Sequence, residues 1–215
     1  MKKLFLLLLV SASCLRADLT ITQQFQQGGK TVDMVVKIKD GKIRIDPNPQ
    51  VSVIMDAKTG ESQNLIHPQK RVVTLSAEAV KKMQEAQMGA QPAAGPVEAP
   101  KPTGKNETIN GYSCEEYETT ANGAKLQIWL TKDLPAAQRA MGDLAVLAVE
   151  GDPMKDLLKG GELPGFPMKT TLTSPDGQVS TVTVKSLNED PLPAKDFEIP
   201  SGYKAATLPA GIPGL

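Results

Sequence analysis

Between Leu19 and Leu75, apolar and polar residues alternate with a period of two, the spacing that places side chains on opposite faces of a β-strand. The clearest run is 31–39, where four apolar side chains share one face: Val32, Met34, Val36 and Ile38. Shorter runs at 51–56, 61–67 and 70–75 are separated by turn residues. Short strands at this spacing are typical of an antiparallel sheet or an open barrel.

The same alternation returns in the second half of the chain. Five further strands are predicted, at 107–110, 112–119, 125–130, 168–174 and 179–187. The third of these places three apolar side chains on one face: Leu126, Ile128 and Leu130. Trp129 falls on the other face. Either both faces of this strand are covered, or the indole is exposed for binding.

Two helical segments are predicted between the strands. Ser76 is a typical N-cap residue for a helix that ends near Met88. Pro135 suits the first turn of a second helix that runs to about Val149. The apolar face of the second helix is too broad to be left in water. We expect its side chains to cover the open side of the sheet as a lid: Met141, Leu144 and Leu147.

Residues 89–104 are rich in proline, glycine and alanine. Such a segment buries too little apolar surface to offset its ordering entropy, so we expect a disordered insert. Strand patterns resume directly after it, which favours one domain over residues 18–203. Residues 204–215 are expected to form a flexible tail.

The N-terminus has the charged, apolar and small-residue regions of a secretory signal, with a peptidase site after Ala17. Its apolar run, 4–10, is too short to span a bilayer, which needs about 20 apolar residues. We therefore expect residues 1–17 to be removed and the protein to be exported to the periplasm. Cys14 leaves one alternative, a lipoprotein anchored to the membrane through this cysteine. No later stretch predicts an integral membrane span.

Charge and composition exclude several function classes. The chain has 24 Lys+Arg against 24 Asp+Glu, so it lacks the basic surface that nucleic acid requires. His67, the single histidine, is interpreted as a surface turn residue, because no nucleophile and carboxylate motif accompanies it. Cys114 is interpreted as a buried small hydrophobe, since the two glutamates that follow it disfavour a reactive thiolate.

The acidic run around Glu116 does not have the spacing of a calcium loop. We interpret it as a solvated strand face. The sequence thus predicts no catalytic residue, no metal site and no cofactor.

Several short motifs resemble an uncharacterised bacterial family, domain of unknown function 4412. They are Gly111-Tyr112-Ser113-Cys114 with Tyr117, Ile128-Trp129-Leu130 with Asp133-Leu134-Pro135, Phe197-Glu198-Ile199-Pro200, and Gly202-Tyr203. That family is similar to the LolA/LolB lipoprotein-carrier superfamily. The resemblance implies a mainly β (α+β) fold, in which a strongly curved antiparallel sheet forms a half-open barrel with two or more helical inserts on its open side. It also implies carriers or sensors of acyl chains rather than enzymes.

Two functions remain open from the sequence. The first is a non-catalytic protein that binds a lipid, an acyl chain or a lipid-modified protein against the concave, apolar side of the sheet. Its candidate lining residues are Val32, Met34, Val36, Ile38, Leu126, Ile128 and Leu130. The same residues would equally form an ordinary core. The second function is an envelope structural or protein–protein interaction module without a lipid cavity, with an envelope protein as partner.

Overall fold

The computed structural model describes residues 18–88, 98–121, 123–147, 154, 157–158 and 163–207. Its strands are β1 Leu19–Gln27, β2 Lys30–Lys39, β3 Lys42–Asn48, β4 Val51–Asp56, β5 Ser62–Ile66, β6 Arg71–Leu75, β7 Lys101–Ile109, β8 Tyr112–Ala121, β9 Ala124–Thr131, β10 Phe166–Thr173, β11 Val179–Asn188 and β12 Lys204–Ala205. Its helices are α1 Ala77–Met88, α2 Pro135–Arg139 and α3 Met141–Leu144, with short 3₁₀ turns η1 His67–Gln69, η2 Ala145–Leu147 and η3 Ala194–Phe197.

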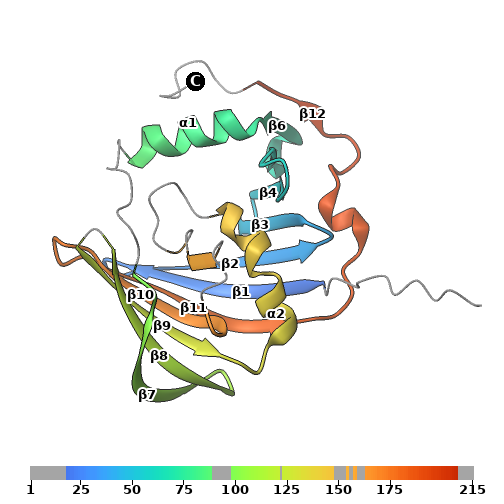
Figure 1. Cartoon of the computed structure of the whole chain (residues 1–215). Coiled ribbons are helices and arrows are strands. Elements are labelled where there is room, and N and C mark those ends of the chain that lie inside the picture. Colours follow the sequence, from blue (N-terminus) through green and yellow to red (C-terminus); the bar gives the residue numbers. More distant parts are fainter. Residues whose placement is uncertain are drawn as a thin grey trace, which may run out of the picture.

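All twelve strands belong to one open sheet, in the order β12-β6-β5-β4-β3-β2-β1-β11-β10-β9-β8-β7. Neighbours pair antiparallel except β12 and β6, which are parallel. The two halves of the chain join where β1 pairs with β11. The sheet curves strongly, as Figure 1 shows, and its outer strands β7 and β12 do not meet. The predicted fold class, a curved antiparallel sheet in a half-open barrel, is confirmed.

Local sequence explains the hairpins. Asp40 and Gly41 both adopt positive φ, 52° and 79°, which is the backbone of the two-residue turn that matches the twist of paired strands. Gly28 and Gly29 make the corresponding turn between β1 and β2. These two turns fix the register of β1, β2 and β3, so the apolar side chains of all three strands fall on the same face.

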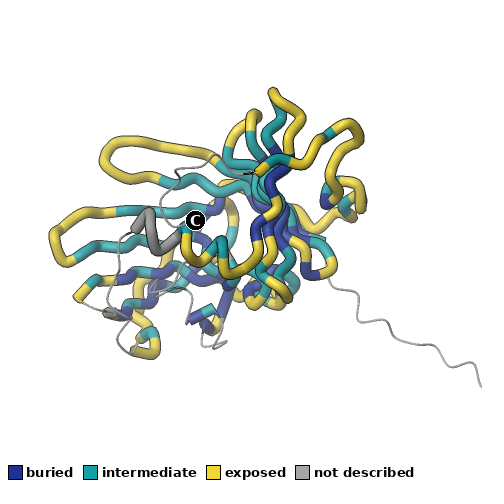
Figure 2. Tube along the Cα trace, turned by 90° about the horizontal axis from the view of Figure 1, so that it is seen from above, coloured by how far each residue is buried: buried dark blue, intermediate teal, exposed yellow. Residues whose placement is uncertain are grey.

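The main hydrophobic core lies on the concave face of the sheet, where α2 and α3 pack against it (Figure 1). Buried positions gather toward the middle of the strands, and hairpin tips are exposed (Figure 2). A second, smaller cluster lies on the convex face and comprises Ile54, Leu65 and Val72, with Tyr203 packed against it.

The single helix predicted from Pro135 to Val149 is wrong. The chain forms α2, α3 and η2 in succession, and residues 148–149 lie outside the described residues. The Ala140 N–H bonds to two carbonyls, those of Ala136 and Ala137, so the helix tightens and ends there. Gly142, two residues further on, has a low helix propensity.

The boundaries of two predicted irregular segments also differ. Of the insert predicted at 89–104, residues 89–97 lie outside the described residues, whereas 101–104 belong to β7. Side chains of Thr103 and Lys105 bond to Glu116 on β8, which draws this segment onto the sheet. The tail predicted at 204–215 begins as β12, because the amides of Lys204 and Ala206 donate to the carbonyls of Lys70 and Val72.

Candidate functional site

The concave face carries the residues that the sequence predicted as cavity lining. Five of the seven lie in the main core, each no more than 3% exposed: Val36, Ile38, Leu126, Ile128 and Leu130. Met34 is half-buried and packs against that core. Val32 is 48% exposed. The structure therefore brings all seven to one face, and that they line a cavity stays a prediction.

Helices α2 and α3 cover only part of this face. In Figure 1 they lie over the end of the sheet where β1 begins, and the β1–β2 hairpin tip extends away from them. Along β2, the apolar side chains of this face change from fully buried at Ile38 and Val36 to half-exposed at Val32. The apolar pattern thus continues beyond the part of the face that the main core fills.

The uncovered stretch forms a row across four strands. Phe25 on β1 pairs with Val32 on β2 and with Val182 on β11, and Val182 in turn pairs with Thr170 on β10. Directly opposed residues of antiparallel strands share a face, so this row lies on the concave side. Phe25, Val182 and Thr170 are half-buried. We call Val32, Phe25, Val182 and Thr170 the apolar track.

The three residues predicted as a lid differ in how far their side chains are buried and described. Met141 is 4% exposed and belongs to the main core. Leu144 is half-buried and packs against that core. Leu147 ends η2, and its side chain lies outside the described part of the molecule, as does all of Cys14. A lid function for these residues stays a prediction.

The convex face of β3–β6 is crossed by residues 191–206, which we call the C-terminal strap. Lys37 Nζ forms an ion pair with Asp196 at 2.7 Å, and Arg44 Nη1 donates to the Asp196 carbonyl at 2.8 Å. Phe197 in the strap is 4% exposed. Tyr203 covers the small convex cluster and donates toward His67. The strap closes one end of the sheet over apolar side chains.

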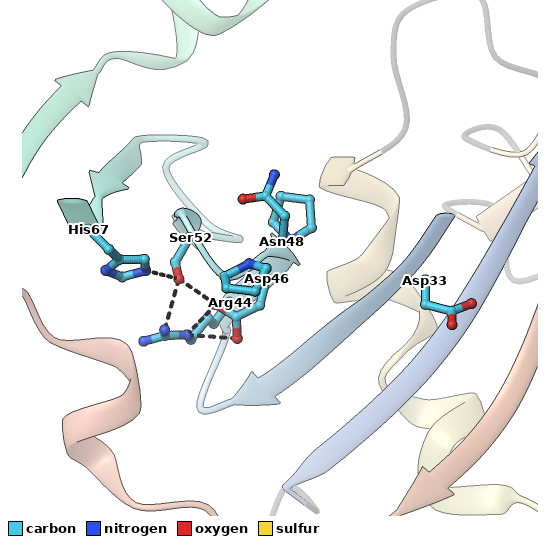
Figure 3. A pocket seen from close by; sticks show the side chains of 8 residues that line it. Asp33, Arg44, Asp46, Asn48, Ser52 and His67 are labelled. Carbon is cyan, nitrogen blue, oxygen red and sulfur yellow. Dashed lines mark hydrogen bonds and ion pairs between the residues drawn. The ribbon is translucent and has the colours of Figure 1, made fainter. Parts of the chain in front are cut away.

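A polar pocket of about 420 Å³ opens beside the strap (Figure 3). Its lining residues are Asp33, Arg44, Asp46, Pro47, Asn48, Pro49, Ser52 and His67. Three of them lie on the same face of β3 and β4: Arg44, Asp46 and Ser52. His67 is the first residue of η1, which directly follows β5. Figure 3 shows the imidazole, the hydroxyl and the guanidinium converging on one point.

This convergence corrects the interpretation of His67 as a surface turn residue. His67 is half-buried, its Nε2 lies 2.7 Å from Ser52 Oγ and its Nδ1 lies 2.5 Å from the Tyr203 hydroxyl. Sequence reasoning missed the group because Tyr203 is 136 positions away from His67. The period-two spacing of Arg44, Asp46 and Ser52 was the one signal available.

The geometry makes Ser52 a structural hydroxyl rather than a nucleophile. Ser52 Oγ donates its hydrogen to Asp46 Oδ1 and accepts from Arg44 Nη2 at 2.9 Å. A hydroxyl has one hydrogen and two lone pairs, so His67 Nε2–H fills the remaining lone pair. No lone pair is left to attack a substrate, and Ser52 is 1% exposed. That the chain carries no catalytic residue stays a prediction.

The acidic run on β8 is not simply a solvated face. Glu116 is 2% exposed, and its carboxylate meets Lys105 Nζ at 2.9 Å and the Thr103 hydroxyl at 2.8 Å. Burial raises the pKa of this carboxyl, but the bonds from Lys105, Thr103 and Gln127 outweigh it, so the pKa lies below the ordinary 4.5. The same contact raises the pKa of Lys105. Together these bonds hold β7 to the sheet.

Trp129 and Cys114 have structural surroundings. Trp129 is half-buried and packs against the main core, with Lys169 Nζ 5.5 Å from its ring centre, so the indole is neither fully covered nor fully exposed. Cys114 is buried, as the sequence predicted, and burial raises the pKa of its thiol. A raised pKa disfavours the thiolate that nucleophilic chemistry requires.

Within the described ranges, His, Cys, Asp and Glu side chains form no group of three or more suited to a metal ion. None of the described helices combines the length and hydropathy needed to cross a bilayer.

Comparison with known proteins yields one family match. The model of a domain of unknown function, DUF4412, matches residues 13–203. It confirms the resemblance that the short motifs indicated. No protein with a curated description matches the chain.

Solved structures with a similar arrangement are remote. PNGF-II shares 17% identity at a TM-score of 0.43, and the match covers 90% of this chain but 31% of PNGF-II. MucB, in the Pseudomonas aeruginosa MucA/MucB complex, shares 14% identity at a TM-score of 0.41. The match covers 87% of this chain and 56% of MucB. The LolA superfamily protein NE2245 from Nitrosomonas europaea shares 11% identity at a TM-score of 0.32. The match covers 86% of this chain and 91% of NE2245. The chain thus spans about a third of PNGF-II and about half of MucB. These likenesses carry no conclusion about ligand or activity.

Proposed function

The chain belongs to the family of domains of unknown function 4412, whose description names no activity, and we propose that it is a non-catalytic exported protein that binds an acyl chain on the concave face of its sheet. The bound acyl chain would be part of a free lipid or of a lipid-modified protein. The signal-like residues 1–17 support export to the periplasm, with anchoring through Cys14 as the alternative.

One observation supports this proposal above the others. The apolar track continues the pattern of the core onto a part of the sheet that the core does not fill, and Val32 at its end is 48% exposed. An apolar side chain at such a position is not needed for the fold. Val32 gains further free energy when something apolar covers it, at about 0.8 kcal/mol for each methylene group removed from water.

A binding test has a matched control in this chain. Val32 and Val179 are 48% and 50% exposed, respectively, but Val32 lies on the concave face and Val179, paired with Thr173, on the convex one. We expect the mature protein to bind the uncharged apolar dye N-phenylnaphthylamine, with displacement by dodecanol. Val32→Gln is expected to weaken binding about tenfold, the loss of about 1.4 kcal/mol of apolar contact.

Val179→Gln makes the same chemical change on the other face and should leave dye binding unaltered. Circular dichroism of both variants checks that the sheet is intact. Absence of dye binding by the parent protein, or equal losses in the two variants, would refute binding on the concave face.

The second candidate function is an envelope interaction module, favoured by the exposed outer strand β7. A strand edge recruits a partner through a regular row of free backbone groups. In β7 the register shifts between Pro102 and Asn106, and Pro102 has no N–H to offer. This interruption favours the concave face over the β7 edge as the binding surface.

A further inference from the structure

A positively charged side chain, Lys30, lies at one end of the apolar track. Lys30 begins β2, two residues before Val32, so both side chains lie on the concave face. Lys30 is exposed, and its ammonium has no ion-pair partner in the described part of the chain. Its opposite residue on β1 is Gln27, which is uncharged. A positive charge therefore lies free beside the outermost apolar side chain of the track.

The track is also narrow. On its outer side, Lys30, Gln27 and Ser180 form a polar row across β2, β1 and β11. On its inner side, Met34 and Val184 already pack in or against the main core. Among the described residues, one row of partly exposed side chains lies between these borders. Four strands at about 4.8 Å spacing give the row a length of about 14 Å, across the strands.

From this arrangement we propose that the occupant of the track is a single-chain lipid with a carboxylate head, a fatty acid, whose head group pairs with Lys30. This inference rests on the proposed function, since it names the ligand class of the same face. A row one side chain wide accommodates one acyl chain and excludes the second chain of a diacyl lipid. A lone lysine is a compact point charge that neutralises one negative charge, the charge of one carboxylate head.

The orientation of the ligand follows from the register. Val32 and Lys30 mark the β2 end of the track, and Thr170 marks the β10 end, beside fully buried Ile128. The carboxylate lies at the solvent-exposed β2 end, where it stays hydrated. The methyl end lies toward the main core, where apolar surface is best shielded from water. Charge and hydration thus favour the same orientation.

Displacement of N-phenylnaphthylamine by three ligands tests the inference: laurate, dodecanol and dioctanoyl phosphatidylglycerol. We expect laurate to compete about three- to fivefold better than dodecanol at low salt, the gain typical of an exposed ion pair. This advantage should disappear at high ionic strength, because salt screens exposed charges. The two-chain lipid should compete more weakly than either single-chain ligand.

Lys30→Gln is expected to remove the preference for laurate and to leave dodecanol unchanged, while Lys30→Arg keeps the preference. Lys58→Gln, an exposed lysine in the β4–β5 turn, is the control and should retain it. Equal competition by laurate and dodecanol, or a preference for the two-chain lipid, would overturn the fatty-acid assignment while acyl binding itself stands. Failure of every ligand to displace the dye would overturn the proposed function as well.

Discussion

At the scale of single residues, Glu116 shows how this chain tolerates a buried charge. An ionised carboxyl out of water is costly unless it is paired and hydrogen-bonded. Glu116 has a cation at Lys105, a hydroxyl donor at Thr103 and an amide donor at Gln127. Two of these three lie on β7, so the charge and the outer strand depend on each other.

This dependence predicts a pH effect. Because the folded pKa of Glu116 lies below its ordinary value of 4.5, the ionised group stabilises the fold above about pH 4.5. That contribution is lost as the pH falls through the folded pKa. Glu116→Gln should therefore be less stable than the parent protein near pH 7, with a difference that shrinks in acid. Urea unfolding at several pH values measures it. Glu189→Gln, at an exposed position, is the control, and an unchanged difference across pH would contradict the prediction.

Residues that the sequence predicted correctly are those governed by local periodicity. Val36, Ile38 and Ile128 are buried because alternation along one strand decides which face a side chain takes. The contact between His67 and Tyr203 joins residues on η1 and the C-terminal strap. It depends on where the strap crosses the sheet, which no local pattern contains. Glu116 was misjudged for a similar reason, since one of its partners, Thr103, lies in a segment that composition alone assigns to a disordered insert.

At the scale of elements, the strands were predictable and the second helix was not. Most strands carry their own alternation, and their bounds differ from the predicted ones by a few residues. The sequence did not predict β12 or the first six residues of β7. The helix from Pro135 had to adapt to the sheet beneath it, and it breaks at Ala140. Its apolar residues were predicted to need a cover, and Met141 is in fact part of the core.

The connection between β9 and β10 imposes a strict local requirement. A Cβ atom added to Gly165 would lie 2.5 Å from the carbonyl oxygen of Thr131, a backbone atom that cannot turn aside. Gly165→Ala should therefore destabilise the fold by about 1–3 kcal/mol, the usual cost of overpacking. Gly142→Ala is the matched control, because nothing lies within 4 Å of its added Cβ atom. Thermal and urea unfolding of both variants measure the contrast, and equal stability of the two would contradict the steric argument.

At the scale of the whole molecule, the open sheet carries apolar side chains on both faces near β4 and β5. Other segments of the same chain must cover each face. The main core lies on the concave side and fills part of it. The convex cluster of Ile54, Leu65 and Val72 depends on the C-terminal strap. The sequence predicted a flexible tail from residue 204 onward, whereas Lys204–Ala205 form β12 at the edge of β6. The position of the strap is set by the Lys37–Asp196 ion pair and by two backbone bonds to the edge of β6.

A truncation tests whether the strap completes the fold. A chain that ends at Asp190 lacks Phe197 and Tyr203 and exposes the convex cluster, so we expect it to lose more than about 2 kcal/mol of unfolding free energy. The exposed apolar surface should also bind the dye anilinonaphthalene sulfonate. A chain that ends at Thr207 keeps every described contact of the strap and is the control. Because the cluster lies on the opposite face from the apolar track, laurate binding should survive in any Asp190-ended protein that remains folded. Equal stability of the two truncated chains would mean that the sheet closes this face without the strap.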